Sequence, residues 1–136
     1  MKRHLLDSNA VSDYVFRRRG VFEKAEFARS QGSMIGTCHA VVAELLAGIE
    51  YSSSRDVNMD RVNRTVSRFR IWPLTLQVAR EYARLYASMR RSGATIQVVD
   101  LIAAATARTL GNCTVVSSDS DMGRVPGLNV ENWATG

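Results

Sequence analysis

The chain has 136 residues, of which 46% are apolar, so it is long enough to bury one core and too apolar to be a disordered polymer. No apolar run reaches the roughly 18 residues that a membrane span needs, and Asp7 follows too early for a signal peptide, so we expect one domain over residues 1–136, in the cytoplasm and without membrane contact. The formal net charge is +5 and all but two of the 18 basic residues are arginines, which favours nucleic acid or an acidic protein as partner, although a generic basic surface has the same composition.

The first half of the chain alternates short apolar runs with helical patterns. Two such runs, residues 4–6 and 34–37, predict strands, and each is followed by residues that favour helix. The helices expected in this half are residues 8–17, 21–31, 38–51 and 56–70. The helix over residues 38–51 is apolar nearly all round, which is typical of a buried helix.

The second half continues the alternation. Residues 71–74 predict a short edge strand because Pro73 cannot donate a ladder hydrogen bond. The remaining expected elements are helices over 75–91 and 98–110, strands over 113–116 and 128–130, and a turn or short helix over 119–123. Six residues of the 75–91 helix form one predicted stripe: Leu76, Ala79, Tyr82, Ala83, Tyr86 and Met89. Three of them, Tyr82, Tyr86 and Met89, are either core residues or a face for pairing. Strands alternating with helices indicate an α/β domain around a mostly parallel sheet.

The cysteines and histidines do not form a recognisable site in the sequence. Cys38 and Cys113 lack CxxC spacing, so we expect two buried thiols in a reducing compartment and no disulfide scaffold. His4 and His39 are too few for a His/Cys zinc site.

Acidic residues at predicted strand ends are the strongest functional signal, because ligands of parallel sheets bind beyond the carboxyl ends of the strands. Asp7 directly follows the first strand, where it could cap the next helix or act in a site, and Ser8 or Asn9 could take over the capping. Glu44 is the only charge in the apolar run 40–48, so it lies either on a narrow exposed stripe or in a buried position that requires a partner.

Three further acids occupy equivalent positions in the second half. Asp100 stands in the first turn of a helix whose small residues allow close packing, which would draw this acid inward. Asp119 and Asp121 follow the strand 113–116, where ordinary turn chemistry also favours aspartate. Gathered at one sheet edge, such carboxylates would repel one another unless a cation lay between them, and oxygen ligands suit Mg²⁺ or Mn²⁺. A metal-dependent nuclease follows from this chemistry.

Four segments in order resemble the PIN-domain ribonucleases, in particular the VapC-type toxins of prokaryotic toxin–antitoxin pairs. Residues 5–9 are similar to the family's "LDTN" motif, residues 42–48 to "xxELxxG", residues 99–104 after Gly93 to "G…DxxIAA", and residues 116–122 to "TNDxDF". The resemblance covers nearly the whole chain. It implies a three-layer α/β/α fold with a mostly parallel central sheet.

The resemblance also implies an Mg²⁺- or Mn²⁺-dependent endoribonuclease, a homodimer, and a cognate antitoxin whose tail enters the acidic groove. The residues implied as catalytic and metal-binding are Asp7, Glu44, Asp100 and Asp119, with Asn9, Ser117 and Asp121 in support. The pair Ser117-Ser118 replaces Thr-Asn and Met122 replaces phenylalanine, which leaves the fourth acid open between Asp119 and Asp121.

Other functions stay open from the residues. A PIN-like module that binds RNA or protein without cutting would keep the same fold. A phosphatase or receiver domain also places an aspartate after its first strand, but the former needs a second aspartate where Asn9 stands and the latter an acidic pair before Asp7. The arginines at 17–19 and at 90–91 are either phosphate contacts or solvated helix ends.

Overall fold

The computed structural model describes residues 1–136 and contains one five-stranded sheet in which every pairing is parallel. The strands lie in the order β3-β2-β1-β4-β5. Their bounds are β1 Arg3–Leu6, β2 Met34–Cys38, β3 Arg70–Trp72, β4 Cys113–Val116 and β5 Asn129–Glu131. The first strand of the chain therefore occupies the centre of the sheet, and β3, which Pro73 ends, is an edge strand as predicted.

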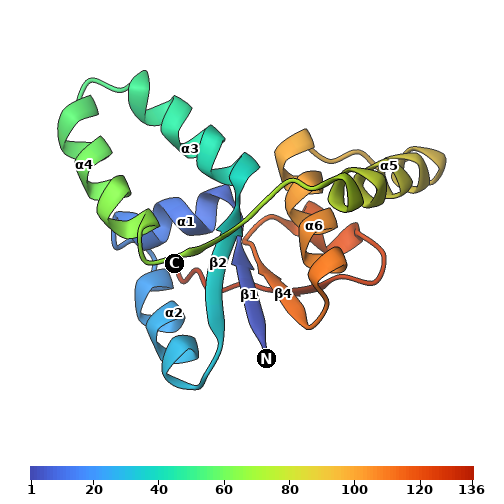
Figure 1. The fold of residues 1–136 in the computed structure, drawn as a ribbon, viewed down its shortest axis with the longest axis horizontal. Coiled ribbons are helices and arrows are strands. Elements are labelled where there is room, and N and C mark those ends of the chain that lie inside the picture. Colours follow the sequence, from blue (N-terminus) through green and yellow to red (C-terminus); the bar gives the residue numbers. More distant parts are fainter.

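Helices cover both faces of the sheet, which makes the three layers that were predicted (Figure 1). Their bounds are α1 Ser8–Val15, α2 Val21–Ser30, α3 His39–Glu50, α4 Arg55–Val66, α5 Leu76–Arg91 and α6 Val98–Leu110, with a short 3-10 helix, η1, over Ser120–Arg124. In Figure 1, α1 and α2 lie on one side of the strands and α5 and α6 on the other, while α3 and α4 extend beyond the strand ends. None of these helices is long and apolar enough to cross a membrane.

The core lies where the central strands meet the helices. Leu5, Leu6 and Val115 are fully buried in the sheet, and α6 packs small alanines between β2, β4 and α5, so that it approaches them closely. Gly36 in β2 is required by a close contact, because a Cβ atom there would lie 2.3 Å from the Arg70 carbonyl oxygen of β3.

The buried face of α5 differs from the predicted stripe. Val78, Leu85 and Met89 are buried. Tyr82 is half-buried, while four members of the predicted stripe are exposed: Leu76, Ala79, Ala83 and Tyr86. The helix has two apolar faces, and the stripe predicted from the sequence combined parts of both. The face of α5 that carries Leu76, Ala79, Ala83 and Tyr86 is therefore exposed to solvent.

The prediction that α3 is buried is wrong. Only Val41 and Ile49 of this helix are buried, and Ala43, Ala47 and Gly48 are exposed. The helix extends past the carboxyl end of β2, so that no sheet lies beneath most of it (Figure 1).

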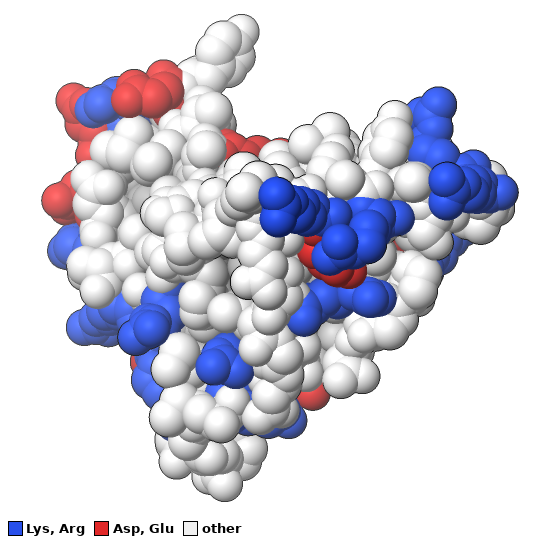
Figure 2. Space-filling model, turned by 45° about the vertical axis from the view of Figure 1, so that its right-hand side comes forward, with Lys and Arg blue, Asp and Glu red and all other residues white.

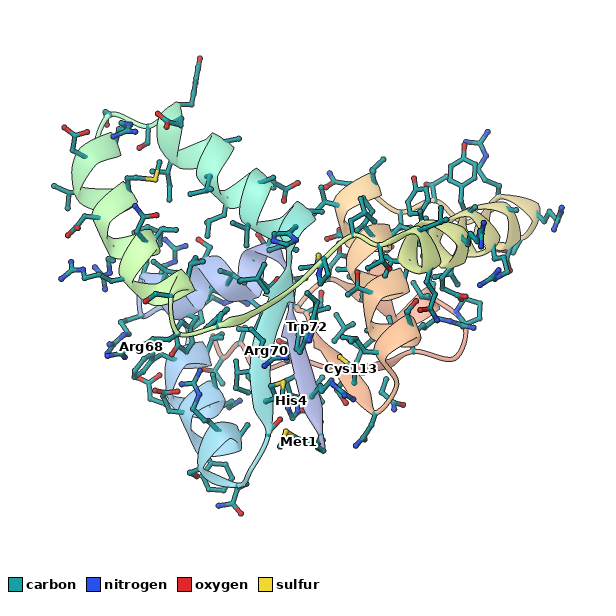
Figure 3. All side chains as sticks on the ribbon, viewed as in Figure 1. Met1, His4, Arg68, Arg70, Trp72 and Cys113 are labelled. Carbon is teal, nitrogen blue, oxygen red and sulfur yellow. The ribbon has the colours of Figure 1, made fainter.

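The two cysteines are free and buried, as predicted. His4 is also buried, in β1 near the start of β4 where Cys113 stands (Figure 3). Its Nδ1 is hydrogen-bonded to Ser33 Oγ and its Nε2 lies 3.5 Å from Glu131 Oε1. Burial lowers the pKa of His4. The imidazole connects β1 with Ser33, the residue before β2, and with Glu131 of β5.

Candidate active site at the carboxyl edge of the sheet

Asp7 connects the central strand to the first helix. It is only 2% exposed, its backbone N–H donates to the Val116 carbonyl of β4 at 3.0 Å, and its Oδ1 accepts from the Ala10 N–H at 2.9 Å. Asp7 is thus the N-cap of α1, and the expectation that Ser8 or Asn9 would free it from capping is wrong. The pKa of Asp7 is raised overall, because burial disfavours the charged form of the carboxyl group. A hydrogen bond from the Ser117 side chain opposes this rise in part.

Ser117 organises the end of β4. Its side chain is buried, its backbone N–H donates to the Glu131 carbonyl at 2.9 Å, and its hydroxyl oxygen accepts from the Asp119 N–H at 3.0 Å. Asp119 in turn caps η1 by accepting from the Asp121 N–H at 2.9 Å. One serine therefore connects the two strand-end aspartates, Asp7 and Asp119.

Asp100 has a raised pKa that reflects its burial and the nearby acids. It lies half-buried in the first turn of α6, and its pKa is raised to about 6, first by burial and then by repulsion from other carboxylates. The repelling residues, in decreasing order, are Asp7, Asp119, Glu44 and Asp121. The other four acids singled out from the sequence therefore lie near enough to Asp100 to act on it electrostatically, although they come from distant segments of the chain.

The five acids differ in exposure. Glu44 projects from α3 and is exposed, so of the two alternatives left by the sequence the exposed stripe is correct. Asp121 is half-exposed, and its Oδ1 lies 3.6 Å from the Arg124 guanidinium. Asn9 is exposed and makes no side-chain hydrogen bond, so its suggested support of Asp7 stays a prediction.

The donor chemistry suits a hard divalent cation, since every side chain in the cluster offers carboxylate oxygens and no histidine or thiolate competes. In this structure no group of three or more His, Cys, Asp or Glu side chains is placed so that it could hold a metal ion. The carboxylates therefore repel one another, and no three of them point at a common position. Mg²⁺ retains several of its waters and needs only one or two direct carboxylates, so an open set of this kind fits it.

Two further polar side chains belong to this edge, Thr37, which the sequence did not single out, and Ser8, which was expected only as a possible helix cap. Thr37 is fully buried in β2 and its hydroxyl donates to the Leu6 carbonyl at 2.6 Å, which fixes the strand end immediately before Asp7. Ser8 Oγ is buried without a hydrogen-bond partner. The sequence did contain a signal for Thr37, because it is a polar residue near the end of the apolar run 34–38.

The arginines separate into two groups. Arg18 and Arg19 contact the Asp13 carboxylate at 3.2 and 3.8 Å, so they stabilise the end of α1. Arg17, Arg90 and Arg91 have no carboxylate partner. Figure 2 shows the basic side chains spread over several parts of the surface in view, including the α5 side.

The fold and the acidic edge together match a known family. Residues 4–128 match the PIN domain, which is nearly the whole chain. The chain belongs to the PIN-domain family. Among its curated relatives, "Ribonuclease VapC2" of Haemophilus influenzae is 30% identical over 133 residues, covering 98% of this chain and 99% of that protein. "Ribonuclease VapC2" of Rickettsia felis is 25% identical over 104 residues, covering 76% and 78%.

Solved structures confirm the PIN fold. The VapBC complex of Salmonella typhimurium bound to DNA matches with a TM-score of 0.89 at 22% identity, covering 98% of this chain and 100% of that one. The VapBC2 complex of Rickettsia felis, bound to a promoter DNA fragment, matches with a TM-score of 0.88 at 23% identity, covering 96% and 98%. The predicted three-layer fold and the resemblance to the PIN domain are both confirmed.

Proposed function

We propose that this PIN-domain protein is an endoribonuclease toxin that cleaves RNA phosphodiester bonds with the help of Mg²⁺ or Mn²⁺. The observation that carries the proposal is the placement of four carboxylates, those of Asp7, Glu44, Asp119 and Asp121, near enough to half-buried Asp100 to act on it electrostatically. Their repulsion adds to the effect of burial, and together these raise the pKa of Asp100 to about 6. The full-length similarity to proteins named ribonuclease VapC supports the same substrate class. RNA as substrate also agrees with action in the cytoplasm.

Asp7, Glu44, Asp100 and Asp119 would hold the metal ion. When bound, such an ion lowers the pKa of its water and stabilises negative charge on the phosphodiester oxygens. The chain's own contribution is positional. The Ala10 N–H holds the Asp7 carboxylate, and Ser117 Oγ holds the Asp119 backbone in register with β4. Glu44 and Asp121 are more exposed than Asp7, so in this proposal they would be the acids nearest to incoming substrate.

The decisive experiment is an RNA cleavage assay with Mg²⁺, Mn²⁺ or EDTA, on the purified protein and two variants. Asp100→Asn removes one carboxylate from the cluster, and Glu23→Gln serves as the matched control because Glu23 is exposed and makes no ion pair. We expect cleavage only with a divalent cation, loss of at least 100-fold in Asp100→Asn, and no change in Glu23→Gln. Cleavage in EDTA, or full activity of Asp100→Asn, would contradict the proposal.

A PIN-like module that binds without cutting is the second candidate. One observation favours it: no three of the acids are placed to hold a metal ion. The same assay separates the two, because a binding module would retain RNA without producing fragments at any metal concentration.

The partner protein that we propose is a cognate antitoxin. Several solved structures with this fold are VapBC complexes. The exposed apolar residues of α3, next to Glu44, offer a surface that such a partner could cover. The test is co-expression with each small protein whose gene adjoins this one, followed by purification. A stable complex without RNA cleavage is expected for one of them, and free, active protein in every case would contradict the proposal.

We further propose that two copies pair through α5. Leu76, Ala79, Ala83 and Tyr86 form an exposed apolar stripe on this helix, and Tyr86 stacks on Tyr82 with ring centres 6.1 Å apart. An exposed apolar patch of this kind is typical of an interface. Light scattering should give a dimer for the wild type and a monomer for Tyr86→Glu, and a wild-type monomer at micromolar concentration would exclude the pairing.

A further inference from the structure

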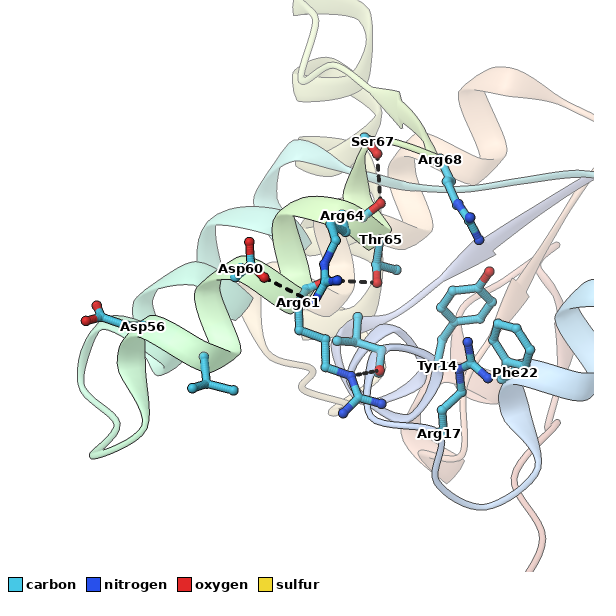
Figure 4. Close-up of a pocket in the computed structure, with 12 residues that line it drawn as sticks. Tyr14, Arg17, Phe22, Asp56, Asp60, Arg61, Arg64, Thr65, Ser67 and Arg68 are labelled. Atoms are coloured by element: carbon cyan, nitrogen blue, oxygen red, sulfur yellow. Dashed lines mark hydrogen bonds and ion pairs between the residues drawn. The ribbon is translucent and has the colours of Figure 1, made fainter.

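A second polar depression lies away from the acidic edge, between α1, α2 and α4. It has a volume of about 910 Å³. We refer to it as the arginine groove and define it by Tyr14, Arg17, Phe22, Arg61 and Arg68, which line it (Figure 4). Nothing in the proposed cleavage chemistry uses these residues.

The groove carries an excess of positive charge. Arg17, Arg61 and Arg68 have no carboxylate within ion-pair distance. The two acids on its rim are already neutralised, since Asp60 lies 3.1 Å from the Arg64 guanidinium and Asp56 lies 2.9 Å from that of Arg55. Three guanidinium groups are therefore available to an anionic ligand.

Two of these arginines are held in place. The Arg17 guanidinium carbon lies 3.4 Å from the centre of the Phe22 ring, a cation–π contact that supports the positive φ of 53° at Arg17. Arg61 Nε donates to the Val15 carbonyl at 2.8 Å, which leaves its two terminal nitrogens free. Arginines positioned in this way lose less conformational entropy when they bind a ligand.

A buried hydroxyl without a partner also points to a ligand. Tyr14 is only 3% exposed, and its hydroxyl is buried without any hydrogen bond. In Figure 4 this hydroxyl is directed toward the side of the groove from which Arg68 projects. An unsatisfied buried polar group destabilises the folded protein, so the retention of this hydroxyl is explained if a bound group accepts a hydrogen bond from it.

We propose that the arginine groove binds phosphates of the RNA strand, at a distance from the acidic edge. This inference rests on the proposed ribonuclease function and deepens it. The acidic edge itself repels RNA, so a cleaving enzyme needs cations elsewhere to hold the strand. The unpaired arginines of the groove supply such cations, and contacts of this kind with phosphates provide binding that does not depend on the base sequence.

The geometry allows one strand to reach both places. Helix α1 begins directly after Asp7 and ends at Val15, on the edge of the groove. Its eight residues span about 12 Å. A short single strand can cover this separation, so the groove would bind substrate several nucleotides away from the bond that is cut.

The first test measures binding without cleavage. A fluorescent single-stranded RNA of about 15 nucleotides is titrated in EDTA over a range of NaCl concentrations. The groove variant is Arg17→Gln with Arg68→Gln. The matched control is Lys2→Gln with Arg80→Gln, two exposed cations outside the groove that also have no carboxylate partner. We expect at least tenfold weaker binding in the groove variant and a slope of log affinity against log salt that is smaller by about 1.4, which corresponds to two lost contacts with a single strand. The control should match the wild type.

The second test is Tyr14→Phe. Removing a hydroxyl that has no protein partner should leave thermal stability unchanged or raise it, whereas RNA affinity should fall about three- to tenfold. A purely structural Tyr14 would change stability and leave the affinity intact.

The outcomes are distinguishable from failure of the proposed function. If the wild type cleaves RNA and all groove variants bind it normally, this inference is wrong and the ribonuclease proposal stands. If the groove variants lose binding of a poly-glutamate peptide but keep RNA binding, the groove serves an acidic protein and the inference is equally wrong. A wild type that neither binds nor cuts RNA overturns both.

Discussion

The carboxylate of Asp7 accepts a hydrogen bond from the backbone N–H of Ala10 at 2.9 Å, so one side chain both begins α1 and belongs to the acidic cluster. A capping carboxylate cannot rotate freely, because it would leave the first turn of the helix unsatisfied. The helix cap therefore fixes the direction of a proposed metal ligand.

This double role separates two substitutions at the same position. Asparagine caps as well as aspartate, whereas alanine does not. We expect both Asp7→Asn and Asp7→Ala to abolish RNA cleavage, with the alanine variant about 1 kcal/mol less stable than the asparagine variant. Urea unfolding of the two proteins checks the difference, and equal stability would show that the cap contributes nothing.

The raised pKa of Asp100 predicts a pH-dependent stability in the absence of metal. Below the usual value of 3.8 its carboxyl is protonated in both states, and between 3.8 and about 6 the folded protein holds the proton more tightly than the unfolded chain. Stability therefore falls as pH rises through this window, and the loss is complete above about pH 6. In EDTA at pH 7, Asp100→Asn should be about 1 kcal/mol more stable than the wild type, after allowance for solvent screening and for the favourable first-turn charge that is lost.

Bound Mg²⁺ should increase the stability of the wild type relative to Asp100→Asn. A bound cation removes the repulsion among the carboxylates, so it should raise the melting temperature of the wild type more than that of Asp100→Asn. Thermal melts at pH 7 with EDTA and with 10 mM Mg²⁺ check the prediction. Equal shifts in both proteins would show that Asp100 does not take part in metal binding.

Ser117 should control activity through orientation. Its hydroxyl accepts from the Asp119 N–H and lowers the pKa of Asp7, so Ser117→Ala removes both effects. We expect a 10- to 100-fold loss of RNA cleavage, as for partners that orient metal ligands in general. Ser117→Thr keeps the hydroxyl and should retain most of the activity, and if alanine were as active as threonine this role would be excluded.

Two glycines provide a matched test of the fold. A Cβ atom at Gly36 would meet the Arg70 carbonyl at 2.3 Å and the Trp72 ring at 2.8 Å, so Gly36→Ala should destabilise the protein by roughly 3 kcal/mol. Gly48 in α3 has nothing within 4 Å of its Cβ position, and alanine there should add about 0.5–1 kcal/mol of helix stability. Chemical unfolding should place the two variants on opposite sides of the wild type.

The sequence predicted every strand and helix to within a few residues, because strong apolar runs bounded by Asp, Gly or Pro leave few alternatives in an α/β chain. It failed where two patterns share one helix. The apolar residues of α5 fall on two faces, and periodicity alone could not decide that Val78 and Leu85 face the core while Tyr86 faces outward. For α3 the composition predicted burial, but the helix lies past the strands that would have covered it.

For the site, position after a strand was sufficient to single out Asp7 and Asp119, because parallel strands end at a common edge. The arginine groove could not be predicted. Arg17 and Arg68 lie 51 residues apart in the sequence, and only the packing of α4 against α1 brings them to one groove. The unpartnered hydroxyl of Tyr14 is likewise a property of packing and has no sequence signal.

The central place of β1 has a consequence for protein synthesis. The first strand to emerge from the ribosome pairs with β2 on one side, but its other neighbour is β4, where Arg3 lies opposite Cys113. Asp7 and Asp119 can therefore meet only after nearly all of the chain has been made. The acidic cluster is therefore complete only after Asp119 has been added to the chain, and a fragment released before that point lacks it.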